Sequence, residues 1–439
     1  MSDMNIDLPA LSARQAGGRQ VEKPLDGVVV EWKPLGEVGV FVRGNGLQKS
    51  DFVESGVGCI HYGQIYTFYG NFAYQTKSFV SPVLATKLRK AQKGDLIIAT
   101  TSENIEDVCK ALVWLGEDEV CVSGETYIFK HNQNPKYLAY YLQTPIFFDF
   151  NKRNQTGTKV IRVHGDKLAE FTIPIPCPDK PEKSLEIQAE IVRILDAFTE
   201  LTAELTAELT VRKKQYNHYR DQLLSFDLPA GRQEGEVEWR ALGNIGEVRM
   251  CKRILKSQTS SEGEIPFYKI GTFGKESDAY IPRSLFEEYK SKYNYPKIGE
   301  ILISASGTIG QTVVFNGEDA YFQDSNIVWI ENDERVVLNK FLFYFYKIAN
   351  WGISEGGTIQ RLYNDNLRKL LIPIPYPNDP DKSLAEQASI IAILDKFDTL
   401  TNSISEGLPC EIALRQKQYE YYRDLLLSFP KPVPETPLE

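Results

Sequence analysis

The stretch Ile173–Leu185, IPIPCPDKPEKSL, returns as Ile372–Leu384, IPIPYPNDPDKSL, about two hundred residues later. Alternating prolines fix φ and remove backbone hydrogen-bond donors, so each copy predicts an edge strand or an extended linker rather than a helix. A long run of helical composition follows each copy. The pattern therefore predicts a rigid strap that leaves a folded domain and enters a helix, twice in one chain.

Other segments repeat in the same order around the two straps. VVEWKPLGEVG from Val29 matches EVEWRALGNIG from Glu236, and RKKQYNHYRDQLLSF from Arg212 matches RQKQYEYYRDLLLSF from Arg415. Between them, short runs rich in Ile, Val, Tyr and Phe, such as GDLIIATT and EILISAS, are typical of strands separated by turns. The period is far above that of solenoid repeats, so the sequence indicates a tandem duplication of one domain–helix pair.

These patterns predict an α+β fold class with pseudo-twofold symmetry. Two mixed α/β domains are separated by two long helices that form an antiparallel coiled coil. The expected segments are a loose leader at 1–27, a first domain at 28–178, a helical region at 179–227, a linker at 228–235, a second domain at 236–377, a second helical region at 378–429 and a tail at 430–439.

Heptad-like spacing supports the pairing of the two helices. The first seam is Ile187, Ile191, Ile194, Phe198, Leu201 and Leu205, and the second is Ile390, Ile393, Phe397, Leu400 and Ile404. The alternative is that each helix packs only on its own domain. Ser383 with Glu386 predicts a capping box at the start of the second helix, and Ser184 predicts a simpler cap at the start of the first. Gly407 and Pro409 are expected to interrupt the second helix.

The segment Thr199–Leu209, TELTAELTAEL, has a period of four residues that the second half lacks. One such unit adds about 6 Å to a helix. If the helices separate two DNA-reading domains, Thr202, Leu205, Thr206 and Leu209 would act as a spacer ruler worth about one to two base pairs at about 3.4 Å each. The alternative is a solvated helix without a ruler role.

Composition limits the class of protein. The 439-residue chain has no apolar run long enough for a membrane span, and its N-terminus lacks the apolar core of a secretory signal. Six scattered cysteines and four isolated histidines predict neither disulfides nor a metal site, so a cytoplasmic protein is expected. No phosphate-binding loop, dinucleotide or S-adenosylmethionine loop, or carboxylate–lysine nuclease set is found, so no catalytic or cofactor-binding residue is predicted.

The net charge of −9 argues against nucleic acid only superficially, because the two expected domains are close to neutral. Residues 31–175 carry 16 basic and 15 acidic side chains, and residues 238–374 carry 17 of each. Arg reads guanine, Asn and Gln read adenine, and Lys mostly contacts phosphate. The candidate DNA-binding residues are Lys87, Arg89, Lys90, Lys152, Arg153, Asn154, Gln155, Lys159, Arg162, Arg249, Lys252, Arg253, Lys256, Lys269, Gln360 and Arg361.

For each of these side chains a merely solvated surface position is the alternative. The clusters Lys152–Gln155 and Arg249–Lys256 are favoured over single residues, because both are polar and free of strand patterning. Gly307 and Gly310 would allow a ligand to approach the backbone closely, but a plain tight turn is the preferred explanation.

The duplicated plan resembles the specificity subunit (HsdS) of type I restriction-modification enzymes, over essentially the whole chain from about Val28 to Phe429. The resemblance rests on GGTIQRLYNDNLRKLLIPIPYP (Gly356–Pro377), ILISASGTIG (Ile301–Gly310) and the twin helix endings. The TAEL repeat is similar to that of the R124-type group of this family. The first half departs from the pattern, because it has TGTKVIRVHGDKL and ATTSENIEDV where the second half has GGTIQRLYNDNL and SASGTIGQTV.

The resemblance implies a non-catalytic subunit of a DNA methyltransferase and restriction endonuclease complex. Its two target recognition domains would read the two halves of a bipartite, asymmetric double-stranded DNA site with a fixed gap. The helices would dock two modification subunits, and restriction–translocase subunits would join the complex. S-adenosylmethionine, ATP and Mg²⁺ are then expected in these partners and not in this chain. A non-catalytic coiled-coil scaffold with two duplicated binding domains and no DNA role stays open, whereas a fused methyltransferase–nuclease is disfavoured by the missing motifs.

Overall fold

The structure is a computed structural model that describes residues 28–226, 236–352 and 361–430. The chain divides into two compact units. Unit 1 contains the residues up to Ala203 together with those from Ala413 onward, and unit 2 is Glu204–Ile412. Each unit is therefore one globular domain with helical segments from both halves of the sequence. The leader at 1–27, the linker at 228–235 and nearly all of the tail lie outside the described residues.

The domain of unit 1 is built on a five-stranded sheet of order β2-β11-β7-β9-β4. Its central strand β7 is buried at every position, since both faces are covered. The sheet comprises β2 (Gly39–Arg43), β4 (Phe72–Ala73), β7 (Leu96–Ala99), β9 (Lys110–Trp114) and β11 (Thr126–His131). The domain also contains a four-stranded sheet of order β5-β3-β10-β6, which consists of β3 (Val57–Ile60), β5 (Ser78–Val80), β6 (Lys90–Ala91) and β10 (Val120–Val122). The remaining elements before the strap are α1 (Leu35–Val38), η1 (Lys49–Asp51), α2 (Tyr62–Thr67), α3 (Pro82–Ala85), β8 (Thr101–Ser102), α4 (Pro135–Tyr141), α5 (Pro145–Asn154), β12 (Ile161–Arg162) and α6 (Gly165–Glu170).

The domain of unit 2 repeats the central part of this plan. Its four-stranded sheet has the order β15-β21-β18-β19 and consists of β15 (Gly246–Arg249), β18 (Ile301–Ser304), β19 (Thr312–Val314) and β21 (Ile327–Asn332). A three-stranded sheet is formed by β16 (Ile265–Tyr268), β17 (Tyr280–Ile281) and β20 (Tyr321–Phe322). The other elements are η2 (Leu242–Asn244), η3 (Lys256–Gln258), η4 (Ile270–Thr272), α8 (Arg283–Lys292), α9 (Asn339–Tyr346) and α10 (Asn364–Lys369).

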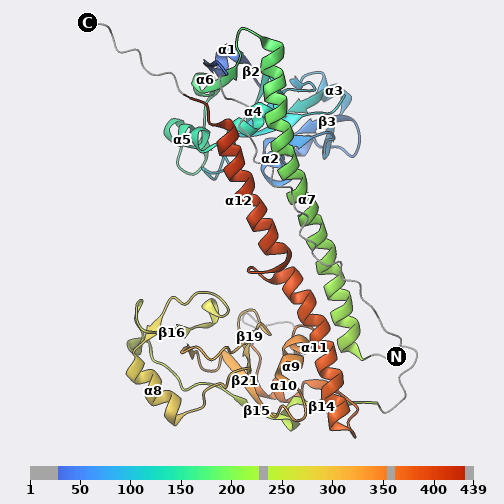
Figure 1. Cartoon of the computed structure of the whole chain (residues 1–439), viewed down its shortest axis with the longest axis vertical. Helices are drawn as coiled ribbons and strands as arrows, with labels where there is room; N and C mark the ends of the chain where they lie inside the picture. Colours follow the sequence, from blue (N-terminus) through green and yellow to red (C-terminus); the bar gives the residue numbers. More distant parts are fainter. Residues whose placement is uncertain (1–27, 227–235, 353–360, 431–439) are drawn as a thin grey trace. The chain divides into compact units, whose positions relative to one another are not determined.

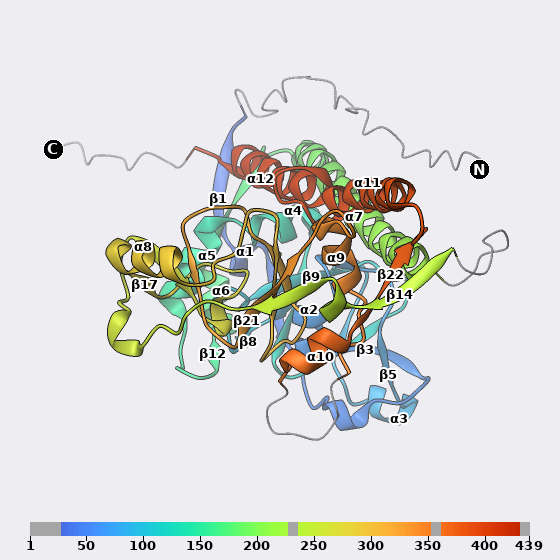
Figure 2. The same cartoon turned by 90° about the horizontal axis from the view of Figure 1, so that it is seen from below.

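The proline-rich straps are edge strands. β13 (Thr172–Pro176) pairs antiparallel with β1 (Val30–Pro34), and β22 (Leu371–Pro375) pairs in the same way with β14 (Val237–Ala241). Figure 2 shows β14 and β22 together. Both ladders have only two strands, so a proline can occupy alternate positions without removing a bond to a further neighbour. The strap prediction is confirmed, and each domain is closed by pairing of its first and last strands.

Three helices carry the domains: α7 (Pro181–Ser225), α11 (Pro380–Asn402) and α12 (Gly407–Leu427). The start of α7 pairs with α12 in unit 1, where the Phe198 and Tyr422 rings stack with centroids 5.1 Å apart. The end of α7 pairs with α11 in unit 2, where Tyr219 stacks on Phe397 at 5.6 Å. Within each unit the paired helices run in opposite directions (Figure 1), so the expected antiparallel pairing is confirmed. The two predicted seams do not face each other, however, because Phe198 of the first contacts α12 in unit 1 and Phe397 of the second contacts the end of α7 in unit 2.

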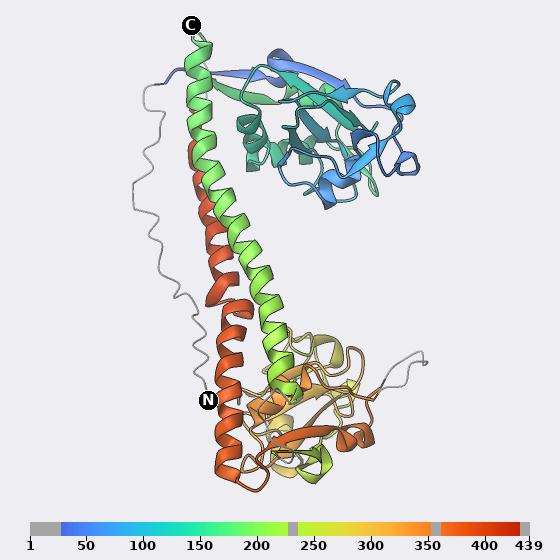
Figure 3. The ribbon, with the colours of Figure 1, turned by 90° about the vertical axis from the view of Figure 1, so that its right-hand side faces the viewer.

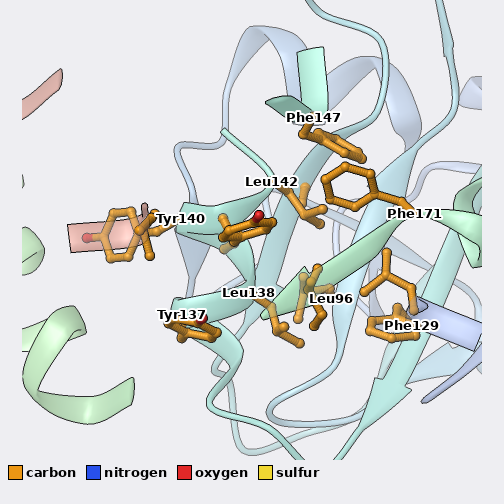
Figure 4. Packing of buried hydrophobic residues seen from close by; sticks show 14 of the residues in the cluster. Leu96, Phe129, Tyr137, Leu138, Tyr140, Leu142, Phe147 and Phe171 are labelled. Atoms are coloured by element: carbon orange, nitrogen blue, oxygen red, sulfur yellow. The ribbon is translucent and has the colours of Figure 1, made fainter. Parts of the chain in front are cut away.

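Both helices also pack on their own domains, which the sequence offered as the alternative to pairing. One face of each helix contacts the domain and another contacts the partner helix. Ile191 and Leu195 of α7 belong to the core cluster of unit 1, and Ile390 and Leu394 of α11 belong to that of unit 2. In unit 1 the blue-to-teal domain lies against one side of the helices (Figure 3). Figure 4 shows Leu96, Phe129, Leu138 and Phe171 gathered in this core.

Each domain core also contains the helix ending of the other repeat. Tyr419, Leu426, Leu427 and Phe429 are buried in the core of unit 1, beside residues that precede them by more than two hundred positions. Their counterparts Tyr216, Leu224 and Phe226 are buried in the core of unit 2. The duplicated helix endings are therefore alike because both perform the same packing role, each in the unit of the opposite repeat.

Buried polar contacts fix each helix on its own domain in the same way. The side-chain oxygen of Gln188 accepts from the Asn134 backbone N–H at 2.9 Å, and that of Gln387 accepts from the Leu338 N–H at 2.9 Å. Both glutamines are fully buried, so losing these bonds would leave buried polar groups unsatisfied. One α4 side chain adds to the anchor in unit 1. Tyr140 donates to Asp196 at 2.6 Å, and burial, reinforced by this bond, raises the pKa of its phenol and keeps it a donor.

The predicted helix caps were wrong. Both helices begin with proline in the first turn, at Pro181 and Pro380, because the fixed φ of proline suits this position. The side chain of Asp379 is the cap of α11 and accepts from the Lys382 N–H at 3.1 Å. Ser184 and Ser383 lie inside the helices, where they are buried and hold Gln188 and Gln387.

The second seam also ends earlier than expected. α11 stops at Asn402, and α12 begins at Gly407, whose φ of +75° suits glycine. Ile404 lies in the intervening turn and is 89% exposed, so its predicted place in the seam was wrong. The interruption expected from Gly407 and Pro409 is confirmed. By contrast, α7 is continuous through Thr202, Leu205, Thr206 and Leu209.

Candidate nucleic-acid interface

Apart from Arg162, the basic candidates of the first domain fall into two surface groups. Lys87 and Arg89 are exposed, and the backbone around them is held by Asn45, whose amide donates to the Lys87 carbonyl at 2.8 Å and accepts from the Arg89 N–H at 2.7 Å. Neither side chain forms an ion pair among the described residues. Lys90 differs, since it lies on β6 and contacts Glu119 at 3.5 Å. Lys87 and Arg89 are thus charges on an ordered turn.

The second group lies at the end of α5. Lys152 and Arg153 occupy its last turn and are exposed, Asn154 ends the helix and donates to the Phe150 carbonyl at 2.9 Å, and Gln155 follows it. Lys159 is exposed in the following loop. The cluster is free of strand structure, as expected, but most of it is helical. Cations at a helix C-terminus also stabilise the helix, because they are attracted to the partial negative charge there. Lys152 and Arg153 therefore have a structural role besides any contact with phosphate.

In the second domain the Arg249–Lys256 cluster is only partly a loop. Arg249 belongs to β15 and bonds Glu331 at 2.8 Å, and this hydrogen bond raises the pKa of the guanidinium. The prediction that Arg249 is free of strand structure was wrong, because Arg249 ends a short edge strand that pairs with β21. Arg253 bonds Asp324 at 2.8 Å, yet its side chain is 68% exposed. Lys252 lies over the Tyr293 ring at 5.1 Å.

Four further candidates complete this domain. Lys256 is exposed at the start of η3, and Lys269 forms an ion pair with Asp278 at 2.8 Å. Gln360 lies outside the described residues. Arg361 directly follows that gap and is exposed beside the central sheet. The structure therefore does not bring all the predicted residues together in either domain.

Arg162 takes part in a polar group at one end of the first domain's central sheet. It lies on β12, which pairs with β8, and its Nε is 3.8 Å from a carboxylate oxygen of Glu125. The hydroxyl of Thr101 donates to the same oxygen at 2.6 Å, and Arg43 lies 4.0 Å from the other oxygen. The carboxylate is thus held by a buried hydroxyl and flanked by two exposed cations. We call Thr101, Glu125 and Arg162 the first sheet-end triad.

Arg361 has the equivalent place in the second domain. It forms a bridge with Ser306, and its guanidinium donates to the Ser325 carbonyl at 3.4 Å. The hydroxyl of Ser306 in turn donates to the side-chain oxygen of Asn326 at 2.9 Å. Here the neutral amide replaces the carboxylate of the first domain. We call Ser306, Asn326 and Arg361 the second sheet-end triad.

The backbone confirms that the two triads are equivalent. The N–H of Val163, next to Arg162, donates to the Thr100 carbonyl at 3.1 Å, and the N–H of Leu362, next to Arg361, donates to the Ala305 carbonyl at 2.8 Å. The strand registers agree as well. Glu125 immediately precedes β11, whose first residue pairs with the last residue of β7, and Asn326 precedes β21, whose first residue pairs with the last of β18.

The GTIG loop after β18 is a tight turn, as preferred from the sequence. Gly307 and Gly310 have φ of +69° and +80°, where only glycine is unstrained. The loop closes through Ser304, whose carbonyl accepts from the Gly310 N–H at 3.0 Å. A Cβ on Gly310 would come within 2.2 Å of the Trp351 indole nitrogen, so packing as well as φ requires glycine there. This turn supports the strand end that carries Ser306.

Sequence reasoning found the two arginines of the triads but missed the other four members. Thr101 and Ser306 follow matching strands in the aligned repeats, so the duplication offered a signal for them. Glu125 and Asn326 gave none, because an acidic and an amide side chain before a strand resemble ordinary turn residues. Among the described residues, no group of three His, Cys, Asp or Glu side chains could hold a metal ion, and no helix has the length and apolar character needed to cross a bilayer.

Comparison with known sequences gives one consistent family. Residues 30–211 and 234–414 each match the type I restriction modification DNA specificity domain. A putative type I restriction enzyme specificity subunit of Haemophilus influenzae is 48% identical over 421 residues, which cover 93% of this chain and 98% of the relative. The specificity subunit of the type I enzymes EcoR124I and EcoR124II of Escherichia coli is 37% identical over 433 residues, covering 94% and 97%.

Solved structures agree on the fold. The S subunit of a type I restriction-modification system from M. genitalium superposes with a TM-score of 0.52 at 13% identity, covering 93% of this chain and 99% of that one. A chain from a structure of type I system assembly and conformational transition gives a TM-score of 0.55 at 15% identity, covering 91% and 97%. At these identities the likeness concerns the fold alone.

Proposed function

Because the chain belongs to the type I restriction-modification DNA specificity family, we propose that it selects the DNA sequence on which such a complex acts. Each domain reads one half of a bipartite, asymmetric double-stranded site, and the helices set the unread gap between the halves. The observation that carries this proposal is the pair of equivalent domains, each with its own polar sheet end, joined by the continuous helix α7. Two linked readers gain affinity only where both half-sites are correctly spaced.

We also propose that two modification subunits dock on the helices. Val211 and Leu414 occupy equivalent positions of the two repeats, and they are 61% and 55% exposed. Tyr421 lies two helical turns after Leu414 and is 65% exposed, and its counterpart His218 is also exposed. Exposed apolar side chains repeated in both units would give two copies of one partner the same contact. Restriction–translocase subunits would join this assembly.

In this proposal the chain itself performs recognition, and its partners perform the chemistry. S-adenosylmethionine would be bound by the modification subunits, and ATP and Mg²⁺ by the restriction–translocase subunits. The target base would be flipped into a modification subunit, since a base amine cannot be methylated within the stack. The complex would then work in the cytoplasm, where its DNA substrate lies.

The proposed function is tested by sequencing the methylome of cells with this gene and its neighbouring subunit genes, and of cells lacking this gene alone. We expect one split motif, with a fixed number of unspecified central bases, to lose all methylation in the deletion. Restoring the gene should restore it. If no methylated motif depends on the gene while the modification subunits are present, the DNA-reading function is contradicted and a scaffold role is favoured.

A second test uses salt. Replacing Lys152 and Arg153 together by Gln should weaken binding of the complex to specific and unrelated duplexes alike, because contacts with phosphate carry no sequence information. Each lost phosphate contact should reduce the slope of log affinity against log salt by about 0.9. Lys93→Gln is the control, since Lys93 is half-exposed but already bonds Glu117. An unchanged slope in the double variant would remove the end of α5 from the interface.

A further inference from the structure

We propose that the two sheet-end triads are base-reading positions, one for each half-site. This inference rests on the proposed DNA-reading function and adds to it the residues that select bases. In each triad a hydroxyl fixes a middle side chain that is Glu125 in the first domain and Asn326 in the second. Glu125 lies beside the exposed Arg162, and the exposed Arg361 pairs with Ser306 and donates to the carbonyl of Ser325, next to Asn326. Both kinds of side chain have defined partners among the base edges of the major groove.

The first triad suits a base pair that offers an amino group. A carboxylate only accepts hydrogen bonds, so Glu125 would accept from the N4 amino group of cytosine, which is the usual partner of an acidic side chain. Its side chain is 34% exposed, so one face is open to a ligand while Thr101 holds the other. Arg43 and Arg162 flank the carboxylate and reduce its repulsion by the DNA phosphates.

The second triad suits adenine. Asn326 has both an acceptor and two donors, and a side-chain amide can bond N6 and N7 of adenine at once. Ser306 donates to the amide oxygen at 2.9 Å, which fixes the orientation of the amide and leaves its NH₂ group directed elsewhere. The oxygen keeps a second lone pair for the adenine amino group. Preorganisation of this kind reduces the entropy cost of recognition.

The arginines extend the reading to the neighbouring base pair. The backbone of Arg162 pairs with that of Thr101, and the backbone of Arg361 pairs in the same way with that of Ser306. Both arginine side chains are exposed. A guanidinium offers donors in a fork that matches O6 and N7 of guanine. The exchange of Glu125 for Asn326 at equivalent positions is then the chemical reason why one chain reads two different half-sites.

The test changes the donor pattern of a middle residue while keeping its shape. Glu125→Gln and Asn326→Asp would each be expressed with the modification subunits, and the methylome of each would be mapped. We expect each variant to lose selectivity at one base pair, by about 5- to 150-fold, without a change in the gap. The base affected by Glu125→Gln should lie in one half-site and that affected by Asn326→Asp in the other.

The controls make the same chemical changes elsewhere. Glu117→Gln is the control in the first domain, because Glu117 is 83% exposed and contacts only Lys93 in the described ion pairs. Arg361→Lys tests the second triad at an exposed position, where folding is not at risk, and should relax one further base next to that read by Asn326. Arg335→Lys is its control, since Arg335 is 89% exposed and pairs with Asp333.

The outcomes separate this inference from the proposed function. If the wild-type chain directs methylation of a split motif and the triad variants direct the same motif with unchanged selectivity, the inference is wrong and the function stands. Uniform loss of binding to every duplex in a folded variant also overturns it, because it indicates a phosphate contact. If the wild-type chain directs no motif, the function itself fails.

Discussion

Deletion of Thr206–Leu209 should abolish methylation of the original motif and create methylation of a motif with a shorter gap. These four residues form one unit of the TAEL repeat within α7, just after the boundary between the two units at Ala203 and Glu204. Their removal shortens the helix by about 6 Å, which corresponds to about one to two base pairs. It also rotates the following residues by only about 40°, so the faces that pack in unit 2 stay nearly in phase.

The measurement is methylome sequencing of cells that express the deletion variant with its partner subunits. The sequences of both half-sites should be unchanged, because no residue of either domain is touched. Thr206→Ala, which keeps the length of the helix, is the control and should preserve the original gap. Retention of the original gap in the deletion variant would contradict a ruler role and leave this segment a solvated helix.

Phe397→Ala should destabilise unit 2 by about 3–5 kcal/mol, the range for removing a buried phenyl ring. Phe397 is 1% exposed, and its ring lies 5.6 Å from that of Tyr219 and 6.3 Å from that of Tyr216. The variant would therefore weaken the contact between α11 and the end of α7 as well as the core beneath it. Hydrogen exchange followed by mass spectrometry should show faster exchange in the peptides of unit 2.

The duplication supplies a matched comparison. Phe198 is the equivalent residue of the first repeat and stacks on Tyr422 at 5.1 Å, but it is only half-buried. Phe198→Ala should therefore cost less, and its faster exchange should appear in unit 1. Ile404→Ala, in the exposed turn between α11 and α12, should change stability by no more than about 0.5 kcal/mol. Equal effects of all three substitutions would show that burial does not control the stability of these helices.

The fold class was predictable because the sequence contains the same domain–helix pattern twice. Alternating proline and isoleucine has few possible conformations, so the extended geometry of β13 and β22 follows from it, whereas their pairing with β1 and β14 came from the structure. That the helices pair was predictable from the heptad spacing, but the segments that face each other were not, because the same apolar residues also pack in the domain cores. A period of seven cannot say which of two equivalent domains a helix ending will contact. The burial of Tyr419 in unit 1 and of Tyr216 in unit 2 therefore emerged only from the structure.

Local competition explains the errors. Ser383 and Asp379 can both cap a helix, and Asp379 does so because Pro380 fits the first turn. Arg249 resembles its loop neighbours in the sequence, but Glu331 on the paired strand bonds it. Glu125 and Asn326 were missed because their significance comes from hydroxyl partners 24 and 20 residues away in the sequence, not from adjacent residues. Such long-range pairs leave no periodic signal in one sequence.

The pairing of β1 with β13, and of β14 with β22, has an evolutionary consequence. The chain enters and leaves each domain side by side, so a domain forms a loop-like insert whose two ends meet at one short ladder. An insert with adjacent ends can be exchanged by recombination without moving the helices that flank it. The amino-acid sequences of the paired strands are nearly the same in both halves, whereas the sequences of the rest of the two inserts have diverged. This arrangement allows new recognition to arise by exchange of whole inserts rather than by the slow accumulation of point mutations.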